Sequence, residues 1–465
     1  MSFLRRARGG RKRRVALVTP PSSFPIKYVP HPYIPNQIVP VTVATPLMPL
    51  GAAYLAASLE KAGYDVKIVD LTFMDNSKFD PAFIGGAILN LKPDVIGLSA
   101  LTWTVPSTYK LANTIRVVDK KIPIVVGGPH VSALPRRTLE ECPSINAAII
   151  GEGEFIFRDF LNLYFRKGFT DEMKKLHGLV YRKGNHIYGD PIPAYIEELD
   201  SIPFPARHLY NITKYLEVSN SFNAKNTPVA SMITSRGCPH QCVFCTRSNN
   251  GLNYRARSPE NVIKEMEELG KMGFKEIQIV DDNFTHDRPR VYEICRLINE
   301  KGLNFSFDLP NGMRVNHFTE ELMSTMYDAG FYNINLGVES GDDEILKKIR
   351  KGTTVAQIKE AIRIAKKVGF QMTLFCVIGL PGSTVESVEK TFELVKKSGY
   401  NFNFSVCTPY PGSPLWDDIK GNLGEISWER YDEGDVNDPL YLPNGMTIDE
   451  LKDLVERANK LAADV

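Results

Sequence analysis

The chain has 465 residues, with 56 Lys and Arg against 54 Asp and Glu for a formal net charge of +2, and 43% of its residues are hydrophobic. This composition excludes wholesale disorder and fibrous repeats, and at about 150 residues per domain it predicts two or three domains. The near-neutral charge argues against a nucleic-acid partner. Because no run of about 18 apolar residues occurs, we expect no transmembrane segment. Clustered cysteines in a chain without a signal peptide indicate a reducing compartment, so we expect a cytoplasmic protein.

In the first half of the chain, short β-rich runs alternate with helical patterns. After a basic tail at residues 1–14, this alternation predicts a parallel, doubly wound, Rossmann-like (flavodoxin-like) α/β domain over residues 15–167. The loop from Pro20 to Pro49 holds nine prolines, so we expect no regular structure there. The turn-rich residues 168–226 are predicted to be a connector, with a hairpin at Gly178–Tyr188. The expected strands are Arg14–Thr19, Asp65–Asp70, Val95–Ser99, Ile122–Val126 and Ala147–Ile150, and the first helix is Leu50–Ala62.

A second alternating series predicts a partial (β/α)6 barrel over residues 227–418. A C-terminal extension at 419–465 ends in an amphipathic helix, Thr447–Leu461, with Thr447 and Glu450 in a capping-box pattern. The barrel strands are expected at Val229–Thr234, Glu276–Val280, Phe305–Leu309, Tyr332–Leu336, Gln371–Val377 and Phe402–Cys407. Its helices are expected at Pro259–Met272, Thr319–Ala329 and Val355–Val368.

Three of the seven cysteines, Cys238, Cys242 and Cys245, form a C-x3-C-x2-C motif just after the first barrel strand. A structural zinc site normally takes four ligands, and here only His240, inside the loop, could be the fourth. Three thiolates favour an iron–sulfur cluster with one open iron, and an open position is typical of a catalytic site. A zinc site stays the alternative. The other four cysteines are scattered, and we expect ordinary buried thiols.

The cysteine motif, with the aromatic Phe244 before its last cysteine, resembles the radical S-adenosylmethionine superfamily. The resemblance implies a [4Fe–4S] cluster whose open iron binds S-adenosylmethionine. The resemblance further implies that an electron from an external donor such as flavodoxin or ferredoxin cleaves the bound S-adenosylmethionine. This cleavage yields a 5′-deoxyadenosyl radical, which abstracts a hydrogen atom. The resemblance also implies S-adenosylmethionine contacts in the cysteine loop and at successive strand ends: Phe244, Asp281, Asp282, Arg314, Glu339, Ser340, Gly379 and Pro381.

Gly127-Gly128-Pro129-His130 and Gly151-Glu152-Gly153-Glu154 look like the cobalamin-binding domain fused to many radical enzymes. The D-x-H-x-x-G pattern that supplies histidine to cobalt in cobalamin mutases is absent, so a bound cobalamin would have no histidine on its lower face. His130 is therefore expected to contact a turn or the nucleotide tail. The cobalamin contacts that the resemblance implies are Ser99, Leu101, Thr102, Gly127, Gly128, His130, Val131, Gly151, Glu152 and Gly153.

Together these resemblances imply a cobalamin-dependent radical enzyme that methylates an unactivated carbon (or phosphorus) of a small-molecule or lipid precursor. An oxidative cyclase or ring-rearranging enzyme with the same cofactors is the enzymatic alternative, and a cobalamin-binding sensor with a structural cluster is the non-enzymatic one. A tRNA methylthiotransferase would carry three further cysteines in the N-terminal domain, which here has only Cys142. Tyr410 is a candidate substrate contact.

Overall fold

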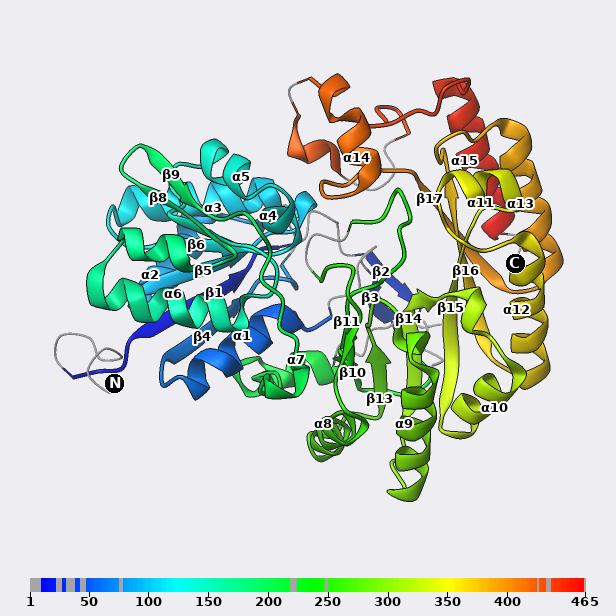
Figure 1. Cartoon of the computed structure of the whole chain (residues 1–465), viewed down its shortest axis with the longest axis horizontal. Coiled ribbons are helices and arrows are strands. Elements are labelled where there is room, and N and C mark those ends of the chain that lie inside the picture. Colours follow the sequence, from blue (N-terminus) through cyan, green and yellow to red (C-terminus); the bar gives the residue numbers. More distant parts are fainter. Residues whose placement is uncertain are drawn as a thin grey trace. The chain divides into compact units, whose positions relative to one another are not determined.

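Two mainly parallel sheets, one in each half of the chain, organise the structure, which is a computed structural model (Figure 1). It describes residues 10–21, 27–30, 38–41, 47–74, 78–217, 224–246, 250–424, 426–431 and 436–463. One unit contains the chain up to residue 222 with residues 247–251 and 427–429, and the other contains the remainder. Of the predicted basic tail, residues 1–9 lie outside the described residues. Among the described residues, no helix is long and apolar enough to cross a membrane.

The sheet of the first unit has the strand order β4-β1-β5-β6-β7-β8-β9. The first five strands run parallel, which confirms the doubly wound prediction. The predicted hairpin forms, and its first strand pairs antiparallel with β7, so the expected connector adds two strands to this sheet. The strands are β1 (Arg14–Thr19), β4 (Asp65–Asp70), β5 (Val95–Ser99), β6 (Ile124–Gly127), β7 (Ala147–Ile149), β8 (Leu179–Lys183) and β9 (His186–Gly189).

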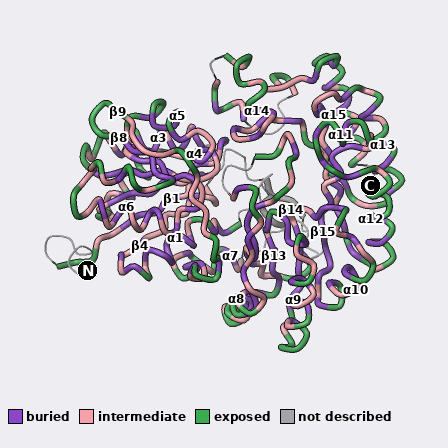
Figure 2. Tube along the Cα trace, in the orientation of Figure 1, coloured by how far each residue is buried: buried purple, intermediate pink, exposed green. Residues whose placement is uncertain are grey.

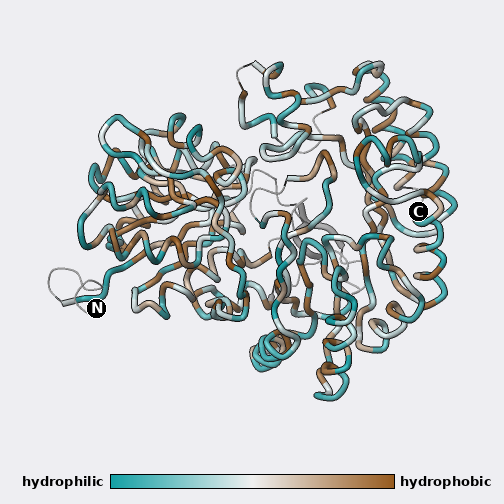
Figure 3. The backbone as a smooth tube through the Cα atoms, viewed as in Figure 1, coloured by the Kyte–Doolittle hydropathy of each residue, from teal (hydrophilic) through white to brown (hydrophobic). Residues whose placement is uncertain are grey.

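Helices cover both faces of this sheet, with α1 packed against α6 and α2 packed against α3. The apolar side chains of α1 and α6 meet the strands in one buried cluster that includes Leu59, Phe157 and Phe160. Buried residues and hydrophobic residues both lie mainly along the strands of the sheet (Figures 2 and 3). The helices are α1 (Leu50–Lys61), α2 (Pro81–Asn90), α3 (Val105–Val118), α4 (Pro129–Ala133), α5 (Pro135–Glu141), α6 (Gly153–Lys167) and α7 (Ile212–Glu217).

The expectation that the proline-rich loop lacks regular structure was wrong in two places. Strands β2 (Lys27–Pro30) and β3 (Ile38–Val41) pair antiparallel within it. Each contains a proline, and the two strands form a sheet of their own. Both strands are therefore edge strands, on which a residue without a backbone N–H is tolerated.

The sheet of the second unit runs β10-β13-β14-β15-β16-β17 with every neighbouring pair parallel, as the barrel prediction requires. The short strands β11 (Ser235–Arg236) and β12 (Arg255–Ala256) pair separately on either side of the cysteine loop. The main strands are β10 (Val229–Met232), β13 (Glu276–Ile279), β14 (Ser306–Met313), β15 (Phe331–Glu339), β16 (Gln371–Ile378) and β17 (Asn401–Val406).

Helices follow the strands in turn and lie along the outside of this sheet (Figure 1). Ser258, the N-cap of α8, accepts a hydrogen bond from the Asn261 amide, 3.2 Å away. The predicted capping box before α15 also forms, with reciprocal bonds between Thr447 and Glu450. The helices are α8 (Pro259–Lys271), α9 (Arg288–Glu300), α10 (Glu320–Asp328), α11 (Asp343–Lys348), α12 (Val355–Val368), α13 (Val385–Ser398), α14 (Pro414–Ile419) and α15 (Ile448–Ala463).

Candidate functional site

The three motif cysteines lie in one loop that leaves β11. All three are free thiols; Cys242 is buried, Cys238 is half-buried and Cys245 is exposed. The amide of Val243 donates to the Ile349 carbonyl at 3.0 Å, and the Leu415 amide donates to the Val243 carbonyl at 2.9 Å. Backbone hydrogen bonds thus hold the centre of the loop to the segment after α11 and to the first turn of α14.

Two adjacent carboxylates at the end of β13 tie the cysteine loop to the sheet. Asp281 accepts three hydrogen bonds of 2.6 Å, from the amide and hydroxyl of Thr234 and from the hydroxyl of Ser235. Burial raises the pKa of Asp281, and the nearby Arg290 counteracts this shift. Asp282 is exposed and accepts a 2.9 Å hydrogen bond from the Gly237 amide, next to Cys238. These bonds indicate that the Asp281 carboxylate positions the start of the loop.

Arg314 brings a buried guanidinium to the cysteines. Its Nη1 lies 3.6 Å from the Cys242 sulfur, and its Nη2 donates to the Lys351 carbonyl. The Nε atom is buried without a hydrogen-bond partner. A charged group with an unsatisfied donor is suited to an anionic ligand or to thiolate sulfur.

At the end of β15, Glu339 forms an ion pair with Lys351, with 2.6 Å between the carboxylate oxygen and Nζ. Both side chains are largely buried, with exposed fractions of 11% and 9%. Glu339 has a backbone φ of 61°, a left-handed conformation that is costly for a residue other than glycine. A Cβ at Gly337 would lie 2.7 Å from Glu339 Oε1 and 2.8 Å from Lys351 Nζ, so a larger residue there would require the two charged ends to shift.

The remaining predicted S-adenosylmethionine contacts also lie at the loop or at strand ends of the second unit. Phe244 is half-buried within the cysteine loop. Ser340 is buried after β15, and its hydroxyl accepts from the Asp342 amide at 3.2 Å. Gly379 and Pro381 follow β16, the glycine buried and the proline half-buried. Their contacts with a bound ligand stay predictions.

The donor set of the cysteine loop bears on the choice between zinc and an iron–sulfur cluster. A structural zinc site normally takes four ligands, whereas the loop offers three thiols. Three thiols fit an iron–sulfur cluster with one open iron better than a mononuclear zinc site. Burial raises the pKa of the Cys238 thiol most, and the Asp282 carboxylate raises it further. A metal that binds this thiol must therefore displace a proton.

In the first unit, Gly128 and His130 shape the loop after β6. Gly128 has a φ of 112°, and a Cβ there would lie 2.7 Å from the Ala100 carbonyl oxygen. His130 is 1% exposed, and its ring packs edge-on against Trp428 with 4.6 Å between centroids. Burial lowers the pKa of His130 to about 3, and its Nε2 has no hydrogen-bond partner. A neutral histidine with an orphaned nitrogen fits the expected turn or ligand contact.

The other predicted cobalamin contacts gather at the carboxyl ends of β5, β6 and β7, where ligands of doubly wound sheets bind. Thr102 Oγ1 lies 3.4 Å from His130 Nδ1, and Glu152 accepts a 2.7 Å bond from the Ile196 amide. The Gly151 amide donates to the Ser132 hydroxyl at 2.9 Å. Thr102, Val131 and Glu152 are buried, whereas the half-buried members are Ser99, Leu101, Gly127, Gly151 and Gly153. The small residues and the Gly128 cradle fit a large flat cofactor.

Tyr410, the candidate substrate contact, is half-buried after β17 and packs against Tyr431 with 5.5 Å between ring centroids. Its contact with substrate stays a prediction. Lys351 was missed by the sequence interpretation, because its partner Glu339 is twelve residues away and only the fold brings them together. A lysine in a turn between two short helical patterns gives no signal of burial.

Comparison with known proteins agrees with the candidate residues of each unit. The model of the radical SAM superfamily matches residues 232–395, and that of the B12 binding domain matches residues 36–161. The first range contains the cysteine loop, the Asp281–Asp282 pair, Arg314 and Glu339. The second contains the strand ends around Gly128 and His130.

An uncharacterized methyltransferase of Pyrococcus horikoshii is 34% identical over 96% of this chain and 91% of its own length. The cytidylyl-2-hydroxyethylphosphonate methyltransferase of Streptomyces wedmorensis is 29% identical over 72% of this chain and 69% of its own. Other relatives are named anaerobic magnesium-protoporphyrin IX monomethyl ester cyclases.

The fold is similar to that of the radical S-adenosylmethionine methyltransferase TsrM of Kitasatospora setae, solved with cobalamin and a [4Fe–4S] cluster. The TM-score is 0.69 at 18% identity, covering 96% of this chain and 86% of that one. A relative that is 34% identical over nearly the whole chain and the two family matches show the family. The chain belongs to the B12-binding radical SAM enzymes, whose cofactors are a [4Fe–4S] cluster, S-adenosylmethionine and cobalamin.

Proposed function

We propose that this enzyme transfers a methyl group from S-adenosylmethionine to an unactivated carbon of a small-molecule or lipid precursor. The observation that carries the proposal is the similarity to a methyltransferase over 96% of the chain. The cofactors would supply the radical that activates the substrate and the methyl group that it receives.

The chain's own residues would bind and orient these groups. Cys238, Cys242 and Cys245 would hold the cluster, with Asp281 and Asp282 fixing the two ends of the segment that leads into the loop. The buried Arg314, 3.6 Å from the Cys242 sulfur, would offset negative charge on the cluster or on the carboxylate of S-adenosylmethionine.

The ion pair of Glu339 and Lys351 places two charged groups at the end of β15. We expect this pair to hold the polar groups of S-adenosylmethionine, because a charged donor and acceptor at fixed distance can orient an aminocarboxylate. In the first unit, the strand ends around Gly128 would hold cobalamin, with the neutral His130 beside it rather than bound to cobalt.

The test uses anaerobically reconstituted enzyme with S-adenosylmethionine that carries a deuterated methyl group. A metabolite and lipid extract of the source cells serves as the substrate pool, with a reduced flavodoxin as electron donor. We expect both S-adenosylhomocysteine and 5′-deoxyadenosine, with the deuterated methyl group recovered first with cobalamin and then in one component of the extract. Mass analysis of that component would identify the substrate.

A cyclase or ring-rearranging activity is the second candidate, since some relatives of this chain are named cyclases. It predicts 5′-deoxyadenosine without S-adenosylhomocysteine and without labelled product. That outcome would overturn methyl transfer. If S-adenosylmethionine stays intact under reducing conditions although the cluster is present, both enzymatic proposals fail in favour of a sensor.

A further inference from the structure

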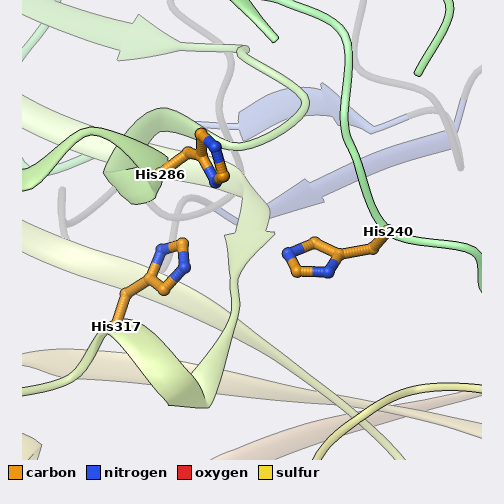
Figure 4. A group of neighbouring side chains, drawn as sticks. All are labelled: His240, His286 and His317. Atoms are coloured by element: carbon orange, nitrogen blue, oxygen red, sulfur yellow. The ribbon is translucent and has the colours of Figure 1, made fainter. Parts of the chain in front are cut away.

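Three histidines from separate segments of the second unit converge next to the cysteine loop. His240 lies within that loop, His286 ends the turn after β13, and His317 ends the turn after β14. Each offers a ring nitrogen, and the three nitrogens all lie within 4.8 Å of one another. Figure 4 shows the rings pointing toward one common space. None of the three belongs to the cluster or to the S-adenosylmethionine contacts described above.

We propose that His240, His286 and His317 form a binding site for a divalent transition-metal ion of the Zn²⁺ class, separate from the iron–sulfur cluster. Zinc–nitrogen bonds of about 2.0–2.1 Å place tetrahedral ligands about 3.4 Å apart. Nitrogens within 4.8 Å of one another therefore need to approach by at most about 1.4 Å. Three imidazoles without a carboxylate select zinc, cobalt or copper over magnesium and calcium.

Two observations in the structure point to a missing ligand at these rings. The Nε2 atom of His240 is buried and has no hydrogen-bond partner, although a buried polar atom normally has one. The Nδ1 atom of His317 lies 3.1 Å from the Thr285 hydroxyl, which leaves Nε2 available to a metal. A hydrogen bond on the far nitrogen is the usual way in which proteins orient a metal-binding histidine.

The three rings lie close to one another. Ring centroids are 6.5 Å apart for His240 with both other rings and 5.9 Å apart for His286 with His317. Burial lowers the pKa of His317 to about 4, so its ring is neutral at pH 7, the form that binds metal.

Three protein ligands leave one position of a tetrahedral ion open to water or to an oxygen of a bound molecule. The ion would also connect the cysteine loop to the segments after β13 and β14. Binding should therefore protect the amides around His240 from hydrogen exchange, whether or not the enzyme turns over.

The test uses enzyme whose cluster has been assembled under anaerobic conditions and which is then given Zn²⁺ and desalted. We expect about one zinc per chain with no loss of iron or sulfide. Zinc-edge X-ray absorption should give Zn–N distances of about 2.0–2.1 Å. Zinc bound at about 2.3 Å with loss of iron would place the ion on the cysteines and overturn the proposal, as would failure to retain zinc.

Variants then assign the ligands. His286→Gln and His317→Gln should each weaken zinc binding at least about tenfold, and Thr285→Val, which removes the orienting hydroxyl, about 10- to 100-fold. His286 is exposed, so its variant should fold normally. His186→Gln, on the exposed start of β9, is the control and should bind zinc like the wild type. Unchanged affinity in both His286 and His317 variants would refute the site.

Discussion

Among single residues, Lys351 has the clearest energetic role, because it neutralises a carboxylate that the fold removes from water. Its partner Glu339 also holds a left-handed backbone conformation at the end of β15. Removing one member of a buried ion pair leaves the other charge without compensation. Removing Lys351 should therefore lower the stability of the protein as well as its affinity for ligands.

We predict that Lys351→Met destabilises the second unit by about 3–5 kcal/mol, seen as a lower midpoint in urea unfolding. The double variant Lys351→Met/Glu339→Gln should recover part of this loss, since no charge is then buried alone. Lys390→Met, which removes a half-exposed lysine bound to Asp342, is the control and should cost less than about 1 kcal/mol. Equal shifts in Lys351→Met and the control would contradict this role.

Cys242 is the buried member of the motif and the one that Arg314 contacts. We predict that Cys242→Ala lowers the iron content of the reconstituted protein and abolishes 5′-deoxyadenosine formation, because alanine offers no thiolate to the cluster. Iron analysis and chromatography of the products measure both. Cys295→Ala, at a buried thiol in α9, should retain cluster and cleavage. S-adenosylmethionine cleavage by the Cys242 variant would disprove the assignment of the motif.

At the scale of elements, strands of the second sheet are joined by buried carboxylates as well as by their ladders. Glu276 on β13 accepts hydrogen bonds of 2.8 Å from the Tyr332 hydroxyl on β15 and from the Asn226 amide. Burial raises the pKa of Glu276 to about 7. The native state therefore holds this proton more tightly than the unfolded chain, where the pKa is about 4.5.

It follows that the contribution of Glu276 is complete below about pH 4.5 and is lost as the pH rises to about 7, by about 3 kcal/mol at most. We predict that Glu276→Gln, whose uncharged amide can accept from the Asn226 amide and donate to the Tyr332 hydroxyl, resembles the wild type at pH 5 and exceeds its urea midpoint at pH 8. Glu267→Gln removes a carboxyl whose pKa is lowered by Lys301. This variant should therefore have a urea midpoint slightly below that of the wild type at pH 8, the opposite of the Glu276 variant. A difference independent of pH would contradict the shift.

Element boundaries could be predicted where local signals define both ends. The helix Val355–Val368 was predicted with its observed limits, since Thr354 caps its start and Gly369 ends it in a left-handed conformation. The strand pair in the proline-rich loop was missed because proline statistics apply to central strands. The attachment of β8 to β7 could not be predicted from the hairpin pattern, as strand pairing depends on distant residues.

The candidate site divides in the same way. The cysteine motif carries its chemistry in local spacing, so Cys238, Cys242 and Cys245 could be identified from sequence alone. Lys351, His286 and His317 could not, because each gains its neighbours only when successive strand ends come together. The three hydrogen bonds of Asp281 to Thr234 and Ser235 depend likewise on the pairing of β10 with β13.

At the scale of the whole molecule, each unit has its own sheet and its own expected cofactor, so ligands should stabilise the two units selectively. We predict that hydroxocobalamin slows hydrogen exchange around β5, β6 and β7 but not around β13 and β14. A ligand at 100 times its Kd adds about 2.7 kcal/mol to the state that binds it. Mass spectrometry of the exchanged peptides measures the protection by unit.

The Cys242→Ala variant is the control for this experiment, since a missing cluster should leave the cobalamin response intact. Gly128→Ala should lose that response, because its added Cβ would meet the Ala100 carbonyl at 2.7 Å. Protection that appears only around β13 and β14 would refute the assignment of cobalamin to the first unit.

The C-terminal helix α15 has a consequence for dividing this protein into parts. Its side chains Leu451, Leu454 and Ala458 are buried in one cluster with Ile378 on β16 and Val388 and Phe392 on α13. The match to the radical SAM superfamily ends at residue 395, before β17 and α15. A fragment cut at that residue would leave the apolar side of α13 in water and would be prone to aggregate. The radical SAM domain therefore needs residues beyond 395 to fold on its own. Exchanging this domain between relatives requires the C-terminal helix α15 to be exchanged with it.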